Sequence, residues 1–359
     1  MKPRRLNGHK GTVTCSLASQ SRPGVIATSG EDGYICWFDM RCKDVMFTME
    51  VHKPISSICF KHGNEEVLYA CSGTEVISFD VRVASSWKPL EIYNYNKEEI
   101  NQVSCSSKSS FIAAADDSGD IKIIDIRQHC LYKTLRSAHT SICSSVQFVP
   151  WKPWEVITGG LDAKLVLWDF SKGKPCKIID FGLPDMESGG SGGQCFNPAF
   201  IHAITIPELD MLDRSGKVCA VARGDGVVDV VDIESELSSF KSKSRNPNPS
   251  ASTSTTTAVD QKKGKRIHLD TSLGGHTAAA SCVSFSLFGE RGKYIISGGN
   301  DAFVKVWDWS KDLDGGEADV LRQNISLRKK VNWICNTPSD SENLVVCDTS
   351  KIVKVFTVA

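Results

Sequence analysis

The chain has no Cys-x-x-Cys pair, although it contains 14 cysteines among its 359 residues. Two cysteines at that spacing are the strongest sequence signal for a structural metal site, so its absence argues against bound zinc. Most of the cysteines stand instead inside short apolar runs, as do Cys15, Cys59, Cys282 and Cys347. A cysteine in such a run behaves as a small buried hydrophobe. We therefore expect reduced, buried thiols, with no metal and no cofactor.

The sequence also has no excess of charge of either sign. Its 42 basic and 42 acidic side chains give a formal net charge of zero. A neutral chain has no general attraction to nucleic acid or to an anionic membrane, although a local basic patch would not show in this total. We therefore do not expect nucleic acid or a membrane among its partners.

Long hydrophobic segments are missing as well. No run approaches the ~20 apolar residues that span a bilayer. The basic residues near the N-terminus are not followed by the apolar stretch of a signal peptide. We expect a soluble intracellular protein, in the cytoplasm, the nucleus or both, which agrees with free thiols. The glycosylation-type sequon at Asn324 then has no role.

Helical stripes of apolar residues are absent, and a different periodicity takes their place. Runs such as IKIID, LVLWD and VKVWD alternate with period two and are rich in β-branched residues, which predicts strands. These runs recur in one pattern: a His, a first run, a second run ending in a turn with Asp, and a third run ending in Asp. Six copies can be followed, although the third lacks the His and the fifth is degenerate. Their third runs end at Asp39, Asp80, Asp125, Asp169, Asp232 and Asp308.

A seventh copy shows only three strand-like runs, from Val331 to Cys335, Leu344 to Cys347 and Ile352 to Val358. A four-stranded blade needs one more strand, and Pro3 to Leu6 is placed to supply it. Such a pairing closes the repeats into a ring and removes the open edges of a linear array. The prediction is an all-β, seven-bladed propeller in a single domain, with its ring closed by the N-terminal strand in the last blade.

The repeat pattern also predicts where the blades and the insertions lie. Two segments interrupt it: 182–194 is rich in Gly and Ser, and 236–266 contains the run NPNPSASTSTTT and has too few apolar residues to order itself. Both are expected to be flexible surface insertions. The expected blades cover approximately residues 8–48, 49–92, 93–135, 136–181, 196–235, 267–318, and 319–359 together with 2–6.

Over nearly its whole length the chain resembles the WD40 family. In that family a His before the innermost strand, a Ser or Thr on the second strand, an Asp in the tight turn and a Trp on the third strand share a buried hydrogen-bond network. The resemblance implies two complete tetrads and one that has Phe38 in place of the Trp. The third and fifth copies lack several tetrad residues, so we expect their blades to be looser. The tetrad residues are His139, Thr158, Asp162 and Trp168, then His276, Ser297, Asp301 and Trp307, and the partial set His9, Thr28 and Asp32.

The same residue types could be taken for parts of a hydrolase, since a His, an Asp and a hydroxyl make a catalytic triad. They recur from copy to copy, however, whereas a catalytic site occurs once. The GGSGG run at Gly189 has no strand before it and no GK[ST] after it, so it does not match a phosphate-binding loop. We therefore expect no enzymatic activity.

Three successive copies end in an Asp-x-Arg box, and later copies do not. These boxes are predicted to lie at equivalent places on neighbouring blades, where the planar Arg side chain is a favoured interface anchor. They resemble the WDxR box of WD40 proteins that dock on the propeller adaptor of cullin-4 ubiquitin ligases, with Phe or Ile in place of the Trp. In the alternative interpretation each Arg only pairs with its local Asp. The box residues are Asp39 and Arg41, Asp80 and Arg82, and Asp125 and Arg127.

A narrower resemblance is to the WD repeat-containing protein 53 family. It rests on five local stretches, and that family is similar to this chain in length. The resemblance names a group of propellers and adds little about mechanism. The stretches are Asn96 to Asn101, Ala115 to Asp125, His139 to Phe148, Ser297 to Asp301 and Lys330 to Trp333.

These patterns favour a protein-interaction scaffold, a monomeric propeller within a complex. Its expected partners are the cullin-4 ligase adaptor and a substrate protein that the sequence does not identify. One alternative is a WD40 reader of histone tails or nucleic acid in chromatin, for which the basic cluster from Lys262 to Arg266 could serve as a contact or a nuclear address. Another is a scaffold unrelated to ubiquitin.

Overall fold

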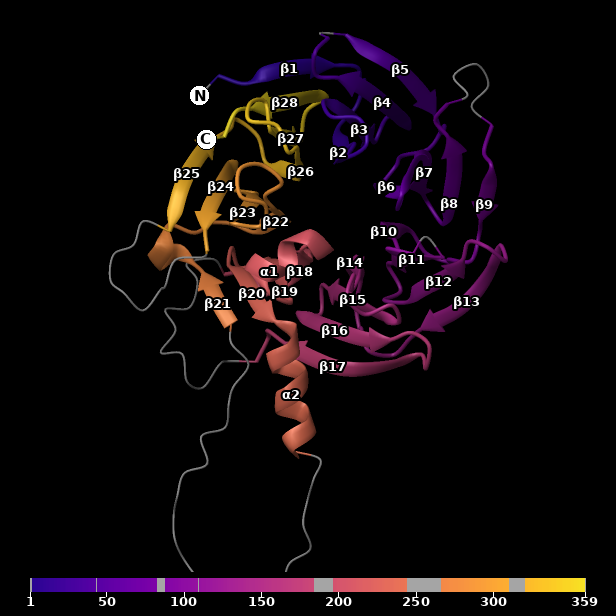
Figure 1. Ribbon diagram of the computed structural model, residues 1–359, viewed down its shortest axis with the longest axis vertical. Coiled ribbons are helices and arrows are strands. Elements are labelled where there is room, and N and C mark those ends of the chain that lie inside the picture. The colour runs from indigo at the N-terminus through magenta and orange to yellow at the C-terminus, as the bar shows by residue number, and fades with distance from the viewer. Residues whose placement is uncertain are drawn as a thin grey trace, which may run out of the picture.

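Seven four-stranded antiparallel sheets, arranged around a central axis, make up the computed structural model (Figure 1). The structure describes residues 2–42, 44–82, 88–108, 110–183, 196–243, 266–309 and 320–358. In six of the sheets the strands follow one another in chain order, and the first strands of adjacent sheets contact each other around the axis. We number the sheets as blades 1 to 7. The predicted seven-bladed propeller is confirmed.

The strands of blades 1 to 3 are short, and most carry apolar or small side chains that are buried. Blade 1 consists of β2 (Val13–Ala18), β3 (Val25–Gly30), β4 (Tyr34–Asp39) and β5 (Val45–Glu50). Blade 2 consists of β6 (Ser57–Lys61), β7 (Asn64–Ser72), β8 (Glu75–Asp80) and β9 (Glu91–Tyr93). Blade 3 consists of β10 (Ile100–Cys105), β11 (Phe111–Asp116), β12 (Ile121–Asp125) and β13 (Cys130–Leu135).

Blades 4 to 6 follow the same plan, with short helices in the connections of blade 5 and before blade 6. Blade 4 consists of β14 (Cys143–Phe148), β15 (Glu155–Gly160), β16 (Lys164–Asp169) and β17 (Lys174–Asp180). Blade 5 consists of β18 (Ile201–Thr205), η1 (Leu209–Met211), α1 (Leu212–Ser215), β19 (Val218–Arg223), β20 (Val228–Asp232), α2 (Ile233–Lys243) and β21 (Arg266–Leu269). The segment η2 (Thr271–Leu273) leads to blade 6, with β22 (Ala280–Phe285), β23 (Tyr294–Gly299), β24 (Phe303–Asp308) and β25 (Leu321–Ser326).

Blade 7 combines the two ends of the chain. It contains β26 (Val331–Asn336), β27 (Leu344–Asp348) and β28 (Ile352–Phe356), and its fourth strand is β1 (Arg4–Asn7). β1 runs antiparallel to β28, with Arg4 opposite Val355 and Asn7 opposite Ile352. The closure predicted from the sequence is confirmed, with the N-terminal strand starting and ending one residue later than expected.

The hydrophobic core consists of seven clusters, each formed between two adjacent blades. Between blades 7 and 1, for example, Leu6 packs in one cluster with Phe38 and Val353, and it is only 1% exposed. A single blade therefore cannot bury its apolar faces alone. Burial of apolar surface drives folding, so the stability of the ring is collective and depends on closure.

The structure corrects the expected boundaries around blade 5. The expected fifth blade ended at 235, but its fourth strand is β21, beyond the long insertion. The fourth strand of blade 6, β25, lies within the range expected for the seventh blade. The insertion expected at 236–266 begins with α2, whose Ile233 and Leu237 pack on the core between blades 4 and 5. Residues 244–265 and 184–195 lie outside the described part of the chain, so the rest of both expected insertions stays a prediction.

Helix α2 is anchored by charged groups from both sides of the insertion. The carboxylate of Glu236 lies 2.8 Å from Nε of Arg266 at the start of β21 and 3.4 Å from Nζ of Lys177 on β17. At its N-terminus, Asp232 accepts a hydrogen bond from the backbone N–H of Ser235, as a helix-capping residue does. Helix α2 is therefore ordered by contacts with β17 and β21. The sequence pattern of the helix itself does not predict these contacts.

Candidate protein-docking face

The up-and-down order of strands divides the connections between the two faces of the ring. Connections from the second to the third strand, and from one blade to the next, lie on one face, which carries the His and Asp of the tetrads. Connections from the first to the second strand, and from the third to the fourth, lie on the other, which carries the Asp-x-Arg boxes. We call them the tetrad face and the Asp-x-Arg face.

On the tetrad face, blade 4 holds its four candidate residues in one continuous network. Nδ1 of His139 lies 3.0 Å from Asp162, and its Nε2 lies 2.7 Å from Oγ1 of Thr158. The indole N–H of Trp168 donates to the same hydroxyl at 2.9 Å. With Nδ1–H donating to the carboxylate and the hydroxyl donating to Nε2, every polar group is satisfied. Burial raises the pKa of Asp162, but the hydrogen bonds from His139 and from the backbone of Thr140 outweigh it, so the net shift is downward.

Blade 6 repeats this network, and blade 1 contains part of it. His276 contacts Asp301 at 3.0 Å and Ser297 at 2.8 Å, and Trp307 donates to Ser297 at 2.9 Å. In blade 1, His9 contacts Asp32 at 3.1 Å and Thr28 at 2.8 Å, while the buried Phe38 stands in the Trp position without a donor. The hydroxyls of Thr158, Ser297 and Thr28 are fully buried, so they cannot reach a substrate as a catalytic nucleophile would.

Blades 3 and 5 have other networks in the same place. In blade 3, Asn96 donates to Asp116 at 2.8 Å. In blade 5, the guanidinium of Arg223 bonds both Asp225 and the fully buried Asp229, and Asp229 also contacts His268 at 2.5 Å. Blades 3 and 5 were expected to be looser because they lack tetrad residues. Their contacts do not support this expectation, since other polar pairs replace the missing tetrad residues.

On the Asp-x-Arg face, each box forms a turn with a shared construction. The Asp accepts a hydrogen bond from the backbone N–H two residues later, at 2.9 Å in blades 1 and 2 and 2.8 Å in blade 3. Such Asp side chains stabilise turns. The middle residue of each box is buried in the core between blades, which directs the following Arg side chain outward. These middle residues are Met40, Val81 and Ile126.

The three arginines differ in what they contact. The side chain of Arg41 bonds both oxygens of Asp39, and that of Arg82 bonds Asp80 and lies 3.1 Å from Glu66. These side chains remain 77% and 63% exposed. Hydrogen bonds from the arginines lower the pKa of Asp39 and Asp80 to about 2. Among the described residues, the Arg127 guanidinium has no hydrogen bond or ion pair, and it borders a pocket between blades 3 and 4.

Later blades use the same turn differently. In blade 4, Lys172 pairs with Asp169 at 2.7 Å, and in blade 6 Arg322 reaches Asp308 from the fourth strand at 3.3 Å. In blade 5 the equivalent residue, Asp232, caps helix α2 instead. An exposed Arg directly after the buried middle residue is thus confined, among the described turns, to blades 1 to 3.

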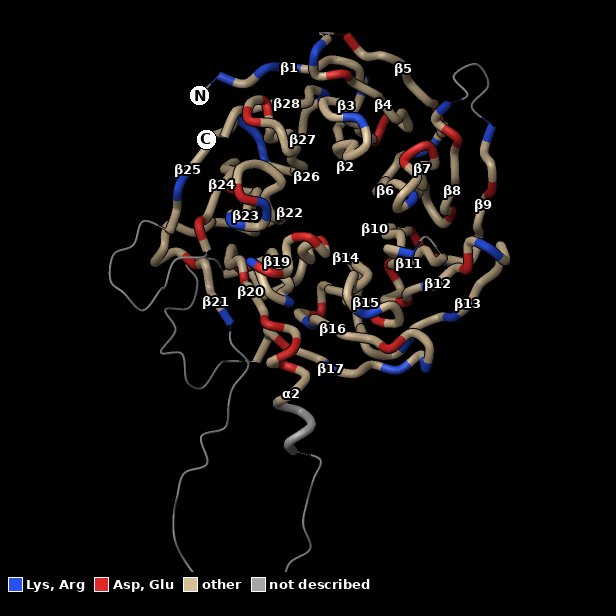
Figure 2. The backbone as a smooth tube through the Cα atoms, viewed as in Figure 1, with Lys and Arg blue, Asp and Glu red and all other residues tan. Residues whose placement is uncertain are grey.

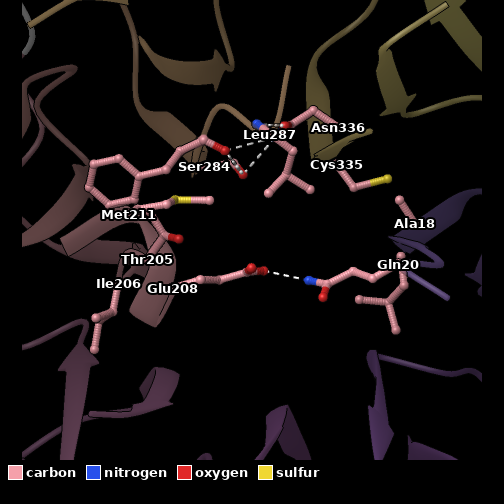
Figure 3. A pocket seen from close by; sticks show the side chains of 12 residues that line it. Ala18, Gln20, Thr205, Ile206, Glu208, Met211, Ser284, Leu287, Cys335 and Asn336 are labelled. Carbon is pink, nitrogen blue, oxygen red and sulfur yellow. Dashed lines mark hydrogen bonds between the residues drawn. The ribbon is translucent and has the colours of Figure 1, made fainter. Parts of the chain in front are cut away.

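A pocket near the central axis, which we call the mouth, also lies on the Asp-x-Arg face, and no sequence pattern predicts its residues. Figure 3 shows Glu208 and Gln20 pointing toward each other across a pocket of about 200 Å³. Gln20, on the β2–β3 connection, donates to the Glu208 carboxylate at 2.5 Å, and Arg291 donates to it at 2.6 Å. This links blades 1, 5 and 6 across the mouth. No local motif marks these residues, because they come from three distant connections.

The described residues form no cluster of metal ligands, and most of their thiols are buried. No three His, Cys, Asp or Glu side chains in the described ranges converge to hold a metal ion. Every cysteine in these ranges is a free thiol, and all but Cys42 are buried or half-buried. Burial raises the pKa of Cys15 and Cys282 to about 12, which suppresses the reactive thiolate. None of the described helices is long and apolar enough to cross a bilayer.

Comparison with known proteins relates these features to a family. The family model "WD domain, G-beta repeat" matches residues 2–39, 129–169 and 268–308, which hold the networks of His, Asp and a hydroxyl in blades 1, 4 and 6. A WD repeat-containing protein 53 homolog from Dictyostelium discoideum is 26% identical over 99% of this chain and 94% of its own length. The WD repeat-containing protein ATCSA-1 from Arabidopsis thaliana is 22% identical over 70% of this chain and 51% of its own length. The solved WD40 beta propeller domain of Doa1 superimposes with a TM-score of 0.68 at 14% identity, covering 99% of this chain and 95% of that one.

Proposed function

Because this chain carries WD40 repeats closed into a seven-bladed propeller, we propose that it is a non-catalytic interaction scaffold that docks on the propeller adaptor of a cullin-4 ubiquitin ligase as a substrate receptor. In this proposal the Asp-x-Arg face meets the adaptor, and the tetrad face presents a substrate protein. The chain acts as a monomer within the complex, in the cytoplasm, the nucleus or both.

The observation that carries the proposal is the placement of three arginines on consecutive blades. Arg41, Arg82 and Arg127 follow the third strand at equivalent turns, and all three are exposed. The guanidinium presents a rigid fork of donors to carboxylates or carbonyls, and Arg is enriched among residues that dominate binding energy. Because Asp39 and Asp80 already orient two of these side chains, less conformational entropy is lost when a partner binds them.

The alternative of a chromatin or nucleic-acid reader has less support. Figure 2 shows basic and acidic residues interspersed around the ring, without a continuous basic track in that view. Proteins that hold a nucleic-acid backbone need such a track. In the basic cluster from Lys262 to Arg266, only Arg266 lies in the described part, and it pairs with Glu236.

Capture of the purified adaptor by the purified chain tests the proposal. Arg82 occupies the middle box, so Arg82→Ala is expected to weaken capture roughly thirtyfold, and the double variant with Arg127→Ala to abolish it. Melting temperatures are expected to match the wild type, because exposed ion pairs contribute little to stability. Lys172→Ala is the matched control, since Lys172 is an exposed cation on the same face outside the boxes. Absence of wild-type capture, or equal capture by the double variant, would refute the receptor role.

A further inference from the structure

A pocket of about 350 Å³ opens on the Asp-x-Arg face between blades 3 and 4. It is bordered by the β10–β11 and β12–β13 connections of blade 3 and by the β14–β15 connection of blade 4. Phe111, Pro153 and Trp154 supply its apolar wall, and Lys108, Asp125 and Arg127 supply charged groups. Its volume lies at the lower end of the range for ligand pockets, which suits one large side chain and its neighbours.

The apolar wall is held in place by a group of aromatic rings, in tilted and edge-to-face contacts, that joins the two blades. The ring of Trp154 lies 5.8 Å from Phe111 and 5.4 Å from the fully buried Phe170, measured between centroids. Its backbone carbonyl accepts a hydrogen bond from the N–H of Phe170 at 3.0 Å. Although it is anchored in this way, the Trp154 side chain is 46% exposed. A rigid, exposed aromatic side chain is the kind of anchor that recurs at binding hot spots.

The charges around the pocket are unbalanced. Arg127 and Lys108 form no ion pair among the described residues, unlike Arg41, Arg82 and Lys172 on the same face. The one bordering carboxylate, Asp125, accepts hydrogen bonds from the backbone N–H groups of Arg127 and Gln128. Two cations therefore flank an aromatic wall, and acidic groups complement them.

We propose that this pocket binds an acidic peptide segment of a partner protein, with a phenylalanine or similar large apolar side chain against Trp154 and flanking carboxylates on Arg127 and Lys108. This inference rests on the proposed function, because it assigns a binding chemistry to one end of the docking face. A nucleic acid fits less well: stacking on Trp154 is available, but two cations beside a carboxylate do not make a phosphate track.

Fluorescence anisotropy with synthetic peptides tests the inference without the adaptor. The probe is a fluorescein-labelled peptide with one phenylalanine between three glutamates on each side. Two further probes replace the phenylalanine by serine, or all glutamates by glutamine, and labelled oligothymidylate represents nucleic acid. The full chain is expected to bind the first probe at least about tenfold more tightly than the other three.

Variants of the full chain locate the binding. Trp154→Ala, and Arg127→Gln combined with Lys108→Gln, are each expected to weaken binding of the first probe about tenfold or more. Lys172→Gln is the matched control and is expected to change nothing, because Lys172 is an exposed cation of the same face that pairs with Asp169 and does not line the pocket. Circular dichroism melts verify that each variant is folded.

The inference is overturned if the chain does not discriminate between the probes, if it prefers oligothymidylate, or if Lys172→Gln weakens binding as much as the pocket variants. Adaptor capture, measured in parallel, separates this failure from failure of the proposed function. Peptide binding that depends on Trp154 without any adaptor capture supports the pocket and removes only the ligase. Adaptor capture that depends on Arg82, without discrimination between the peptides, supports the ligase role and removes the peptide-binding pocket.

Discussion

The two faces of the ring use similar residue types in opposite ways. On the tetrad face, His139 and Asp162 form a hydrogen-bonded pair whose side chains are at most 5% exposed, and the connecting hydroxyl is sealed in the core. On the Asp-x-Arg face, Arg41 and Arg82 meet Asp39 and Asp80 at similar distances, but their guanidinium groups are exposed to water. A buried polar group that loses its partner costs stability, whereas an exposed pair contributes little and remains available to a partner. The same chemistry is therefore structural on one face and suited to binding on the other.

Two tryptophans of blade 4 allow this comparison to be tested with the largest expected effect. Trp168 is fully buried in the tetrad, and Trp168→Ala is expected to lower the free energy of unfolding by about 3–5 kcal/mol. Trp154→Ala removes a half-exposed ring on the Asp-x-Arg face and is expected to cost much less. Urea denaturation followed by circular dichroism measures both. Similar losses for the two variants would erase the distinction between the faces.

Within the tetrad face, the two kinds of polar network provide an intermediate effect. Asp162→Ala leaves Nδ1 of His139 without an acceptor and is expected to cost about 1–3 kcal/mol. Asp225→Ala in blade 5 is expected to cost less, because Arg223 retains its contact with Asp229. Neither variant should change adaptor capture. If chemical denaturation showed equal losses of stability for the two variants, the contact between Arg223 and Asp229 would not compensate for the loss of Asp225.

The smallest expected effect is on pH dependence. Burial lowers the pKa of His9, although Asp32 opposes the shift. The folded state then favours neutral imidazole, while the unfolded chain takes up a proton near the ordinary pKa of 6.5. The stability contributed by neutral His9 is present above that pH and is lost as the pH falls through the lowered pKa.

Free energies of unfolding measured from pH 7 to pH 5 should therefore decline, and His9→Gln should make the decline shallower. Asp39 and Asp80, with pKa values of about 2, stay ionised throughout this window. The affinity for the adaptor is therefore expected to stay constant over the same range if the Asp-x-Arg pairs are its determinants. An unchanged slope in the variant would show that another group controls the decline.

The repeating pattern was sufficient to predict the ring and its closure, because each blade follows local alternation and recognisable turns. In blade 5, only the fourth strand escaped prediction, since β21 lies beyond the long insertion and its pairing with β20 is not local. The replacement network around Arg223 was missed for the same reason, because His268 comes from that strand.

The pocket was missed for a related reason. Trp154 belongs to the sequence PWKPW in the β14–β15 connection, and an aromatic residue in a proline-rich turn was a signal that could have been noticed. Its surroundings could not have been, because Phe111 and Arg127 reach it from another blade. The sequence likewise presents the three arginines as equivalent, and only their side-chain contacts and the neighbouring pocket distinguish Arg127 from Arg41 and Arg82.

Hydrogen–deuterium exchange of the chain with and without the purified adaptor tests the assignment of the faces most directly. The account predicts slower exchange in the turns around Arg41, Arg82 and Arg127 when the adaptor is bound. Exchange in the connections that carry His9, His139 and His276 should be unchanged. Protection confined to the tetrad face, or no difference anywhere at saturating adaptor, would contradict the account.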